Sequence, residues 1–376
     1  MSHLQGTLGS SRFMPGGGTR AKVTSIAFAI VGILLVLSAF IAVSFTASAA
    51  TQNAGFNQNG NVLITDQFNN RVIEVNPLTK AIVWSFGSGN PLLCNPGAHS
   101  ESGSNDAERV GNGYTIISGT GIPAGVAGAT ACVDNRVIVV DSAGKIVWQY
   151  GQAGKTGSGP NLLSVPVFAI QLPNHDILIT DQSNERVIEV NLNHQIVWQY
   201  GTTGVTGKGP NQLNNPNSAE LLLNGNILIA DENNNRTIEV TRSHHIAWQD
   251  GQGLFLVAFA SRLANGNTLI TDSGHSRIIE VTSSKHVVFQ YFTNKQTNSN
   301  SNPLPTNAVR LSTGQTMIAD QFNSRVILIT PQKQITFQYG ITNVAGNGFN
   351  TLFDPYTGFV VGDYTGQTVP PTNFFP

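Results

Sequence analysis

Five aspartates each stand five positions before an arginine, and a repeated carboxylate of this kind has the chemistry to bind a metal ion or a sugar. In tight loops, however, an aspartate more often accepts backbone N–H bonds, and the arginine then pairs or packs between repeats. We therefore expect a structural role, with no metal site and no cofactor. The residues are Asp66, Asp181, Asp231, Asp272, Asp320, Arg71, Arg186, Arg236, Arg277 and Arg325.

His275 is the histidine whose surroundings come closest to catalytic chemistry, because Arg277 stands two positions after it as a cationic neighbour. A zinc site needs three or four converging ligands, whereas only His99 and His275 are expected in loops on the same face as the aspartates. The sequence shows no Ser-His-Asp motif and no phosphate-binding loop. His275 and Arg277 are thus candidate catalytic residues, although the sequence as a whole favours a protein that is not an enzyme.

Aromatic residues recur beside two of the aspartates. Phe68 and Phe322 hold the same place in two copies of the phrase Asp-Gln-Phe-Asn, and three further rings, Phe349, Phe353 and Tyr356, follow in the last part of the chain. With the side chains of Gln67, Asn69, Gln321 and Asn323, they are candidate binding residues for a sugar or a protein partner. The alternative is that the rings only fill a seam inside the fold.

The elements that position these residues come from an internal repeat of roughly 40–50 residues, a period typical of repeat architectures. Six copies of an Arg-centred apolar phrase begin at Arg71, Arg136, Arg186, Arg236, Arg277 and Arg325. An aromatic residue follows each arginine twelve or thirteen positions later and is expected in the core between repeats. These aromatics are Trp84, Trp148, Trp198, Trp248, Phe289 and Phe337.

Each copy contains four short β-rich runs separated by turn residues. In residues 217–251 the runs are 218–223, 227–230, 236–240 and 246–249, and Asn224-Gly225-Asn226 provides a hairpin turn. A repeated four-stranded sheet is a propeller blade, whereas a β-sandwich does not repeat an internal phrase. The sequence therefore predicts an all-β fold, a six-bladed β-propeller of four-stranded antiparallel blades preceded by one N-terminal hydrophobic helix.

The two ends of the repeat region complement one another. The first copy begins at residues 59–61 without a convincing strand before it, and residues 346–361 match the loop and innermost strand of a blade with nothing after them. We therefore expect pairing between residues 358–361 and 62–65, which closes blade 1 and removes two open strand edges.

The phrase Gly204-x-x-Gly207-x-Gly209-x-x-Leu213-x-x-Pro216, followed by Gly225-Asn-Ile-Leu-Ile-Ala-Asp231-x-x-Asn234-x-Arg236, resembles the NHL repeat. The likeness covers about residues 54–366 and is weak in blade 2. The run Ile-Val-Trp-Gln-Tyr-Gly is also similar to outer strands of arylsulfotransferase-like propellers. NHL-like propellers include binding and sensor modules and one lyase class, so the resemblance implies a propeller and selects no activity.

The N-terminal region predicts an exported protein. Residues 1–22 are basic, residues 23–49 read as either a cleaved signal peptide or a membrane anchor, residues 50–366 hold the propeller and residues 367–376 form a tail. Both alternatives place the propeller outside the cytoplasm. There, a disulfide between Cys94 and Cys132 is expected. Ala131 holds the aspartate position of blade 2, in an enlarged loop over residues 119–135. The disulfide would therefore replace the bonds by which the aspartate usually holds this loop.

The charge balance excludes one class of partner. The chain has a net charge of −1 and only 11% charged residues, so it offers no basic surface for nucleic acid. We expect an exported or membrane-anchored binding or scaffold propeller whose loops recognise a protein or glycan. The alternative is an extracytoplasmic enzyme, arylsulfotransferase-like or a lyase, with a site in the central channel. The sequence does not indicate an oligomeric state.

Overall fold

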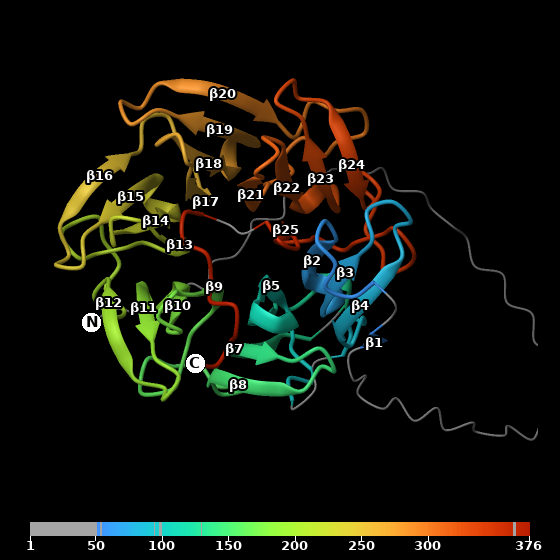
Figure 1. Cartoon of the computed structure of the whole chain (residues 1–376), viewed down its shortest axis with the longest axis horizontal. Coiled ribbons are helices and arrows are strands. Elements are labelled where there is room, and N and C mark those ends of the chain that lie inside the picture. The colour runs from blue at the N-terminus through green and yellow to red at the C-terminus, as the bar shows by residue number, and fades with distance from the viewer. Residues whose placement is uncertain (1–50, 53–54, 94, 98–99, 129, 364–365) are drawn as a thin grey trace, which may run out of the picture. The chain divides into compact units, whose positions relative to one another are not determined.

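The structure is a computed structural model that describes residues 51–376 except 53–54, 94, 98–99, 129 and 364–365. Six antiparallel sheets stand in a ring (Figure 1). In five of them the first strand is nearest the centre and the fourth is at the rim, whereas in the sixth the innermost strand is the last strand of the chain. The predicted all-β six-bladed propeller is therefore confirmed. The predicted N-terminal helix, which was expected to be either a signal peptide or a membrane anchor, lies outside the described residues. Within the described part of the chain, no helix has the length and hydropathy needed to cross a membrane.

The six blades have these strands. Blade 1 contains β2 (Val62–Asp66), β3 (Arg71–Val75), β4 (Ile82–Gly87) and β25 (Gly358–Val360). Blade 2 contains β5 (Ser104–Val110), β6 (Tyr114–Ile122), β7 (Cys132–Val140) and β8 (Ile146–Gly151). Blade 3 contains β9 (Pro166–Gln171), β10 (Ile177–Asp181), β11 (Arg186–Val190) and β12 (Ile196–Tyr200). Blade 4 contains β13 (Pro216–Leu221), β14 (Ile227–Asp231), β15 (Arg236–Val240) and β16 (Ile246–Asp250). Blade 5 contains β17 (Val257–Arg262), β18 (Thr268–Asp272), β19 (Arg277–Val281) and β20 (Val287–Phe292). Blade 6 contains β21 (Asn307–Arg310), β22 (Thr316–Asp320), β23 (Arg325–Ile329) and β24 (Ile335–Tyr339).

Blade 1 is closed by the two distant parts of the chain, as the incomplete first and last repeats predict. Strand β25 pairs antiparallel with β2, with Val62 opposite Val360 and Ile64 opposite Gly358. The closing contact also brings Val62 and Ile64 into one buried cluster with residues of blade 6. Pairing satisfies the inner edge of β2, which would otherwise offer unpaired N–H and C=O groups to other chains.

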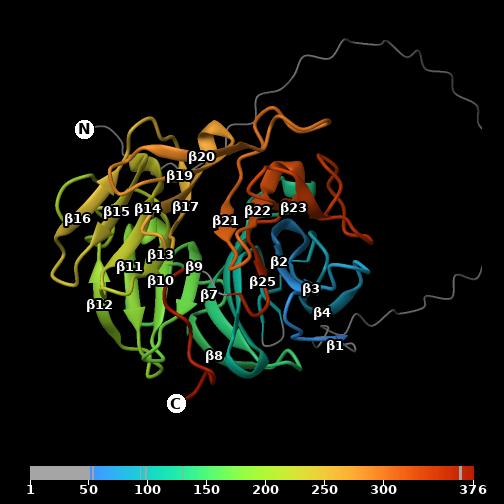
Figure 2. The ribbon, with the colours of Figure 1, turned by 45° about the horizontal axis from the view of Figure 1, so that its top comes forward.

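The rim of blade 1 carries a strand that the sequence does not suggest. Residues Thr51–Gln52 form β1, which pairs antiparallel with β4 and makes this sheet five-stranded. A pairing of two residues leaves no hydrophobic alternation to recognise, so periodicity has no means of finding it. Strand β1 covers the outer edge of blade 1, whereas in the other five sheets the fourth strand is the outermost (Figure 2).

The recurring tryptophans join neighbouring blades. Trp84, in the outer strand of blade 1, donates its indole N–H to the carbonyl of Ser142 in blade 2 at 3.1 Å. The same bond runs from Trp148 to Leu192, from Trp198 to Arg242 and from Trp248 to Ser283. Each ring packs apolar surface between sheets while its polar edge holds the next blade, as expected for residues of the core between repeats.

A second set of bonds between blades starts from residues in the left-handed conformation. Asn70, with φ of 51°, accepts the N–H of Gly103 in blade 2 on its side-chain oxygen at 2.8 Å. Asn135, Glu185 and Asn235 do the same for the next blade at 2.5–2.9 Å. Because asparagine tolerates positive φ, it supplies both the turn and the bond in three of these blades, and in blade 3 Glu185 holds the same conformation with φ of 58°.

Candidate functional site

The repeated aspartates hold the loops of their own blades. Asp181 accepts bonds from Arg186 Nε at 2.8 Å, Asn184 Nδ2 at 2.7 Å and the backbone N–H of Ser164 at 2.7 Å. Ser164 belongs to the segment that leads into β9, so the carboxylate joins the start of the inner strand to the loop after β10. The carboxylates of Asp66, Asp231, Asp272 and Asp320 each accept the matching arginine at 2.6–2.8 Å. The structural role expected for them is therefore what the geometry describes.

Blade 2 differs from the expected arrangement. Strand β6 ends at Ile122 and β7 begins at Cys132. The loop between them is therefore shorter than the predicted loop over residues 119–135. The expectation that a disulfide replaces the missing aspartate is wrong, because Asp134 supplies the carboxylate instead. Asp134 pairs with Arg136 at 2.5 Å and accepts the N–H of Ser102 at 2.9 Å. Cys132 is buried in β7, while Cys94 lies outside the described residues, so the disulfide stays a prediction.

His275 stands where other blades carry an asparagine. Its Nδ1 lies 3.0 Å from Asp272 Oδ2, and Arg277 Nε binds the same oxygen at 2.6 Å. Asn69, Asn184, Asn234 and Asn323 make the equivalent bond to their aspartates at 2.7–2.8 Å. The imidazole is half exposed and also lies against the ring of Phe255. The candidate catalytic residues His275 and Arg277 thus lie at a surface loop and bind Asp272 as the asparagines and arginines of other blades bind their aspartates.

Amide, hydroxyl and carboxyl groups meet where the inner strands begin, and we call this set the channel mouth: Gln67, Asn105, Asn217, Glu232, Gln321 and Tyr356. Gln321 Nε2 donates to Gln67 Oε1 at 3.0 Å, and Gln67 Nε2 donates to Asn105 Oδ1 at 3.0 Å. Tyr356, in the segment before β25, bonds through its hydroxyl to Asn217 of blade 4 at 2.9–3.0 Å. Because blades 1 and 4 are opposite one another, this bond crosses the channel.

Glu232 completes the channel mouth and has no arginine or lysine within an ion-pair distance in the part of the chain that the structure describes. Its Oε2 accepts Asn217 Nδ2 at 2.9 Å and Asn215 Nδ2 at 3.1 Å. Burial of the carboxyl raises its pKa to about 7, although the amide donors act in the opposite direction. Glu232, Asn105 and Asn217 are absent from the sequence-based candidates. For Glu232 the available signal was the position directly after each repeated aspartate, which reads Gln67, Gln182, Glu232, Ser273 and Gln321; Asn105 and Asn217 have no such signal.

The predicted binding residues divide into three groups. Gln67, Gln321 and Tyr356 belong to the bonded network of the channel mouth. The amides of Asn69 and Asn323 are buried and bonded to their aspartates and to backbone carbonyls, so both are saturated. Four rings are at least partly exposed, and we call Phe68, Phe322, Phe349 and Phe353 the aromatic rim. Phe68 packs edge-on against Phe353 with ring centroids 5.5 Å apart, and Phe349 is 71% exposed. Phe68 follows Gln67 and Phe322 follows Gln321, and these two glutamines bond to each other between blades 1 and 6.

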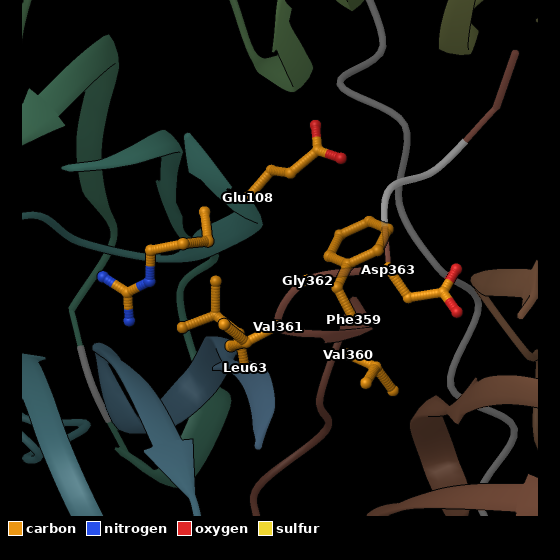
Figure 3. A pocket seen from close by; sticks show the side chains of 8 residues that line it. Leu63, Glu108, Phe359, Val360, Val361, Gly362 and Asp363 are labelled. Carbon is orange, nitrogen blue, oxygen red and sulfur yellow. The ribbon is translucent and has the colours of Figure 1, made fainter. Parts of the chain in front are cut away.

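Below the channel mouth, side chains fill the channel. Phe168 of blade 3 and Phe259 of blade 5 meet across the axis with centroids 5.5 Å apart, and Phe359 and Val309 join the same buried cluster. A pocket of about 10 Å³ lies beside Leu63, Glu108 and Phe359 (Figure 3), which is room for about one water molecule. Side chains of several blades therefore occupy the channel at this level.

Buried carboxyls in this region make stability depend on pH. Asp106 is 1% exposed, and burial raises its pKa to about 7, although its Oδ2 accepts the N–H of Ala169 at 3.1 Å. A carboxyl whose pKa is higher in the folded state gives full stability below about pH 4 and loses it as the pH rises towards 7.

We expect Asp106→Asn to be more stable than the wild type at pH 8, because the amide needs no ionisation inside the fold. The gain should be of the order of 1–4 kcal/mol, since one pKa unit corresponds to about 1.4 kcal/mol. At pH 4 the two proteins should unfold at the same urea concentration. Urea unfolding at both pH values measures this, and an equal loss of stability in both proteins between pH 4 and 8 contradicts it.

The described residues hold no group of three or more His, Cys, Asp or Glu side chains placed to bind a metal ion. The aspartates of the repeats accept bonds from arginines, asparagines and, as at Asp181, a backbone N–H group, whereas Asp320 Oδ1 is buried without a hydrogen-bond partner among the described residues.

Comparison with known proteins gives the fold. No family profile and no curated protein matches the sequence. A protein of unknown function from Bacteroides caccae is 14% identical with a TM-score of 0.55, over 75% of this chain and 93% of that one. Virginiamycin B lyase from Staphylococcus aureus is 16% identical with a TM-score of 0.49, over 78% of this chain and 85% of that one. At 14% identity, the likeness to the Bacteroides caccae protein shows a shared fold and assigns no activity.

Proposed function

We propose that the protein is a binding module that recognises a protein or glycan partner through the channel mouth and the aromatic rim. The observation that carries this is the arrangement of partly exposed rings around a buried, hydrogen-bonded network of amide, hydroxyl and carboxyl groups, above a channel that side chains occupy. Aromatic rings supply apolar contact at small entropic cost, and amides supply directional hydrogen bonds. A surface of this kind suits a partner that lies across the mouth.

The proposal includes a compartment and a family likeness. We infer that the chain is an NHL-like propeller, from the Gly-rich and Asp-x4-Arg phrases, and that it works outside the cytoplasm. The second inference is supported by the basic residues 1–22 followed by a long uncharged apolar stretch. Under this proposal the N-terminal region is either removed on export or retained as a membrane anchor.

The first test is the double substitution Phe68→Ala/Phe322→Ala. Loss of both rings should weaken partner binding at least tenfold, because aromatic anchors at the centre of an interface carry much of its energy. The probe is an array of neutral oligosaccharides, followed by crosslinking to neighbouring surface proteins. Binding should also change little between about 50 and 500 mM salt, because few charges contribute.

The matched control is Leu78→Ala, which removes a 92% exposed side chain from a turn on the opposite face. It should leave binding and thermal unfolding unchanged. A double variant that binds its partner as the wild type does would show that the aromatic rim is not the contact surface.

A catalytic role makes a different prediction at His275. In the binding module, His275→Asn should preserve stability and function, because asparagine makes this tie to aspartate in four other blades. In an enzyme that uses the imidazole, the same substitution should abolish turnover while the thermal unfolding midpoint stays within a few degrees. Loss of a measured activity in His275→Asn would therefore favour the enzyme and count against the binding module.

A further inference from the structure

The last part of the chain lies across the face opposite the channel mouth. We call residues 366–376 the strap; it runs from blade 4 to blades 3 and 2 and ends beside β8 and β9 (Figure 1 and Figure 2). Gln367 donates its backbone N–H to Glu220 Oε1 at 3.0 Å, and Thr368 Oγ1 donates to the carbonyl of Leu221 at 3.2 Å. The strap forms no strand, so no sheet ladder holds it in place.

A single side chain anchors the far end of the strap. Phe374 is fully buried, whereas Val369 is 61% and Phe375 43% exposed. The Phe374 ring lies 5.9 Å from Tyr114 and 6.3 Å from Trp148, between centroids. One buried aromatic within a segment whose other residues are exposed or partly exposed is the pattern of a docked peptide, in which an anchor carries most of the binding energy.

Polar groups of blade 3 fix the backbone of this anchor. The carbonyl oxygen of Phe374 accepts Gln171 Nε2 at 2.8 Å and lies 3.2 Å from His175 Nδ1. Gln171 is 3% exposed, so its amide is buried with the strap as its partner. The cradle thus recognises both a ring and the carbonyl beside it.

Gly111 provides an independent sign that the cradle is shaped for a chain. A Cβ atom at Gly111 would stand 2.1 Å from the carbonyl carbon of Thr372 and 2.5 Å from the nitrogen of Asn373. The φ of Gly111 is not positive, so its own backbone does not call for glycine. The absence of a side chain there is explained by the close approach of the strap, and the neighbouring Asn112 also bonds to Asn373.

We propose that the surface formed by Gly111, Tyr114, Trp148, Gln171 and His175 is a peptide-binding site, filled here by the strap of the same chain. Its partner in trans is the strap of a second copy, an uncharged segment with prolines before a paired phenylalanine. The covalent link gives the chain's own strap a high effective concentration, so exchange requires release of that strap. The site is on the opposite face from the channel mouth and does not depend on the proposed function.

The first experiment uses the full chain and a fluorescent synthetic peptide of residues 366–376. Phe374→Ala releases the chain's own strap and leaves the cradle intact, so it should bind the peptide at least tenfold more tightly than the wild type. The double variant Gly111→Ala/Phe374→Ala should not bind, because the new Cβ closes the cradle. A peptide carrying Phe374→Ala is the matched control and should fail with all proteins. Equal binding to every protein, or no binding to folded Phe374→Ala, overturns the peptide site.

The second experiment tests the second copy as partner. Gly111→Ala has a free strap and a closed cradle, whereas Phe374→Ala has an open cradle and no anchor. An equimolar mixture should therefore form a one-to-one complex on size-exclusion chromatography with light scattering, and each variant alone should stay unassociated. Hydrogen exchange should first show that both variants keep a protected ring and that the strap of Gly111→Ala has lost protection. Folded variants that do not associate, or a strap that stays protected, overturn exchange between copies.

Discussion

Deletion of residues 346–376 is expected to produce an insoluble or aggregated protein. The deletion removes β25, so the inner edge of β2 and the buried side chains of Val62 and Ile64 become exposed. It also takes Phe359 out of the cluster that fills the channel. An open apolar strand edge is a template for pairing with another chain. The measurement is the soluble fraction on expression, followed by light scattering of any protein recovered.

The shorter deletion of residues 366–376 is the matched control, because it removes the strap and keeps β25 paired with β2. We expect this protein to stay soluble with a native circular dichroism spectrum. If the longer deletion also yields a soluble monomer with native tertiary signals, strand β25 is not needed to close the ring.

The second large effect is expected for Asp181→Ala. The substitution leaves Arg186 buried without its carboxylate, since its side chain is only 3% exposed. It also leaves the Ser164 N–H without an acceptor and removes one of the two acceptors of the Asn184 amide, which keeps its bond to the Gly157 carbonyl. Removing one member of a buried ion pair costs about 3–5 kcal/mol. Urea unfolding should report this loss. Hydrogen exchange should place the damage mainly in blades 2 and 3, since damage in repeat proteins stays close to its origin.

The double variant Asp181→Ala/Arg186→Met separates charge from packing. Replacing both partners removes the unpaired charge, so it should recover part of the loss. A cost below about 1 kcal/mol for Asp181→Ala alone would mean that water or another group replaces the carboxylate, and that the tie does not hold the blade.

The features readable from the sequence were those that every blade repeats. The turn at Asn224-Gly225, the Asp-x4-Arg spacing and the tryptophan of the outer strand recur because each blade meets the same neighbours in the same way. Closure of blade 1 was also predictable. The chain carries part of a repeat at each end, and the two parts together make one complete blade. A short strand or turn pattern is weak evidence in one blade, but its recurrence in several blades makes the prediction firm.

The features that were missed occur once. Strand β1 has two residues, the strap has no strand period, and Asp134 serves Arg136 from two positions away instead of five. The bonds of the channel mouth join Tyr356 to Asn217, residues 139 positions apart. Such contacts follow from the ring geometry, which brings opposite blades together at the axis. The composition of either segment alone does not indicate them.

Because blade 1 is completed by the last strand of the chain, its folding also depends on the rate of synthesis. About 290 residues separate the end of β2 at Asp66 from the start of β25 at Gly358. At roughly 5–20 residues per second, the ribosome needs on the order of 15–60 s to add them. Throughout that interval the inner edge of β2 waits without its partner, while blades 2–6 are made in order. Crowded polysomes or a pause in translation would lengthen this exposure, so the yield of native protein depends on how fast the last strand arrives.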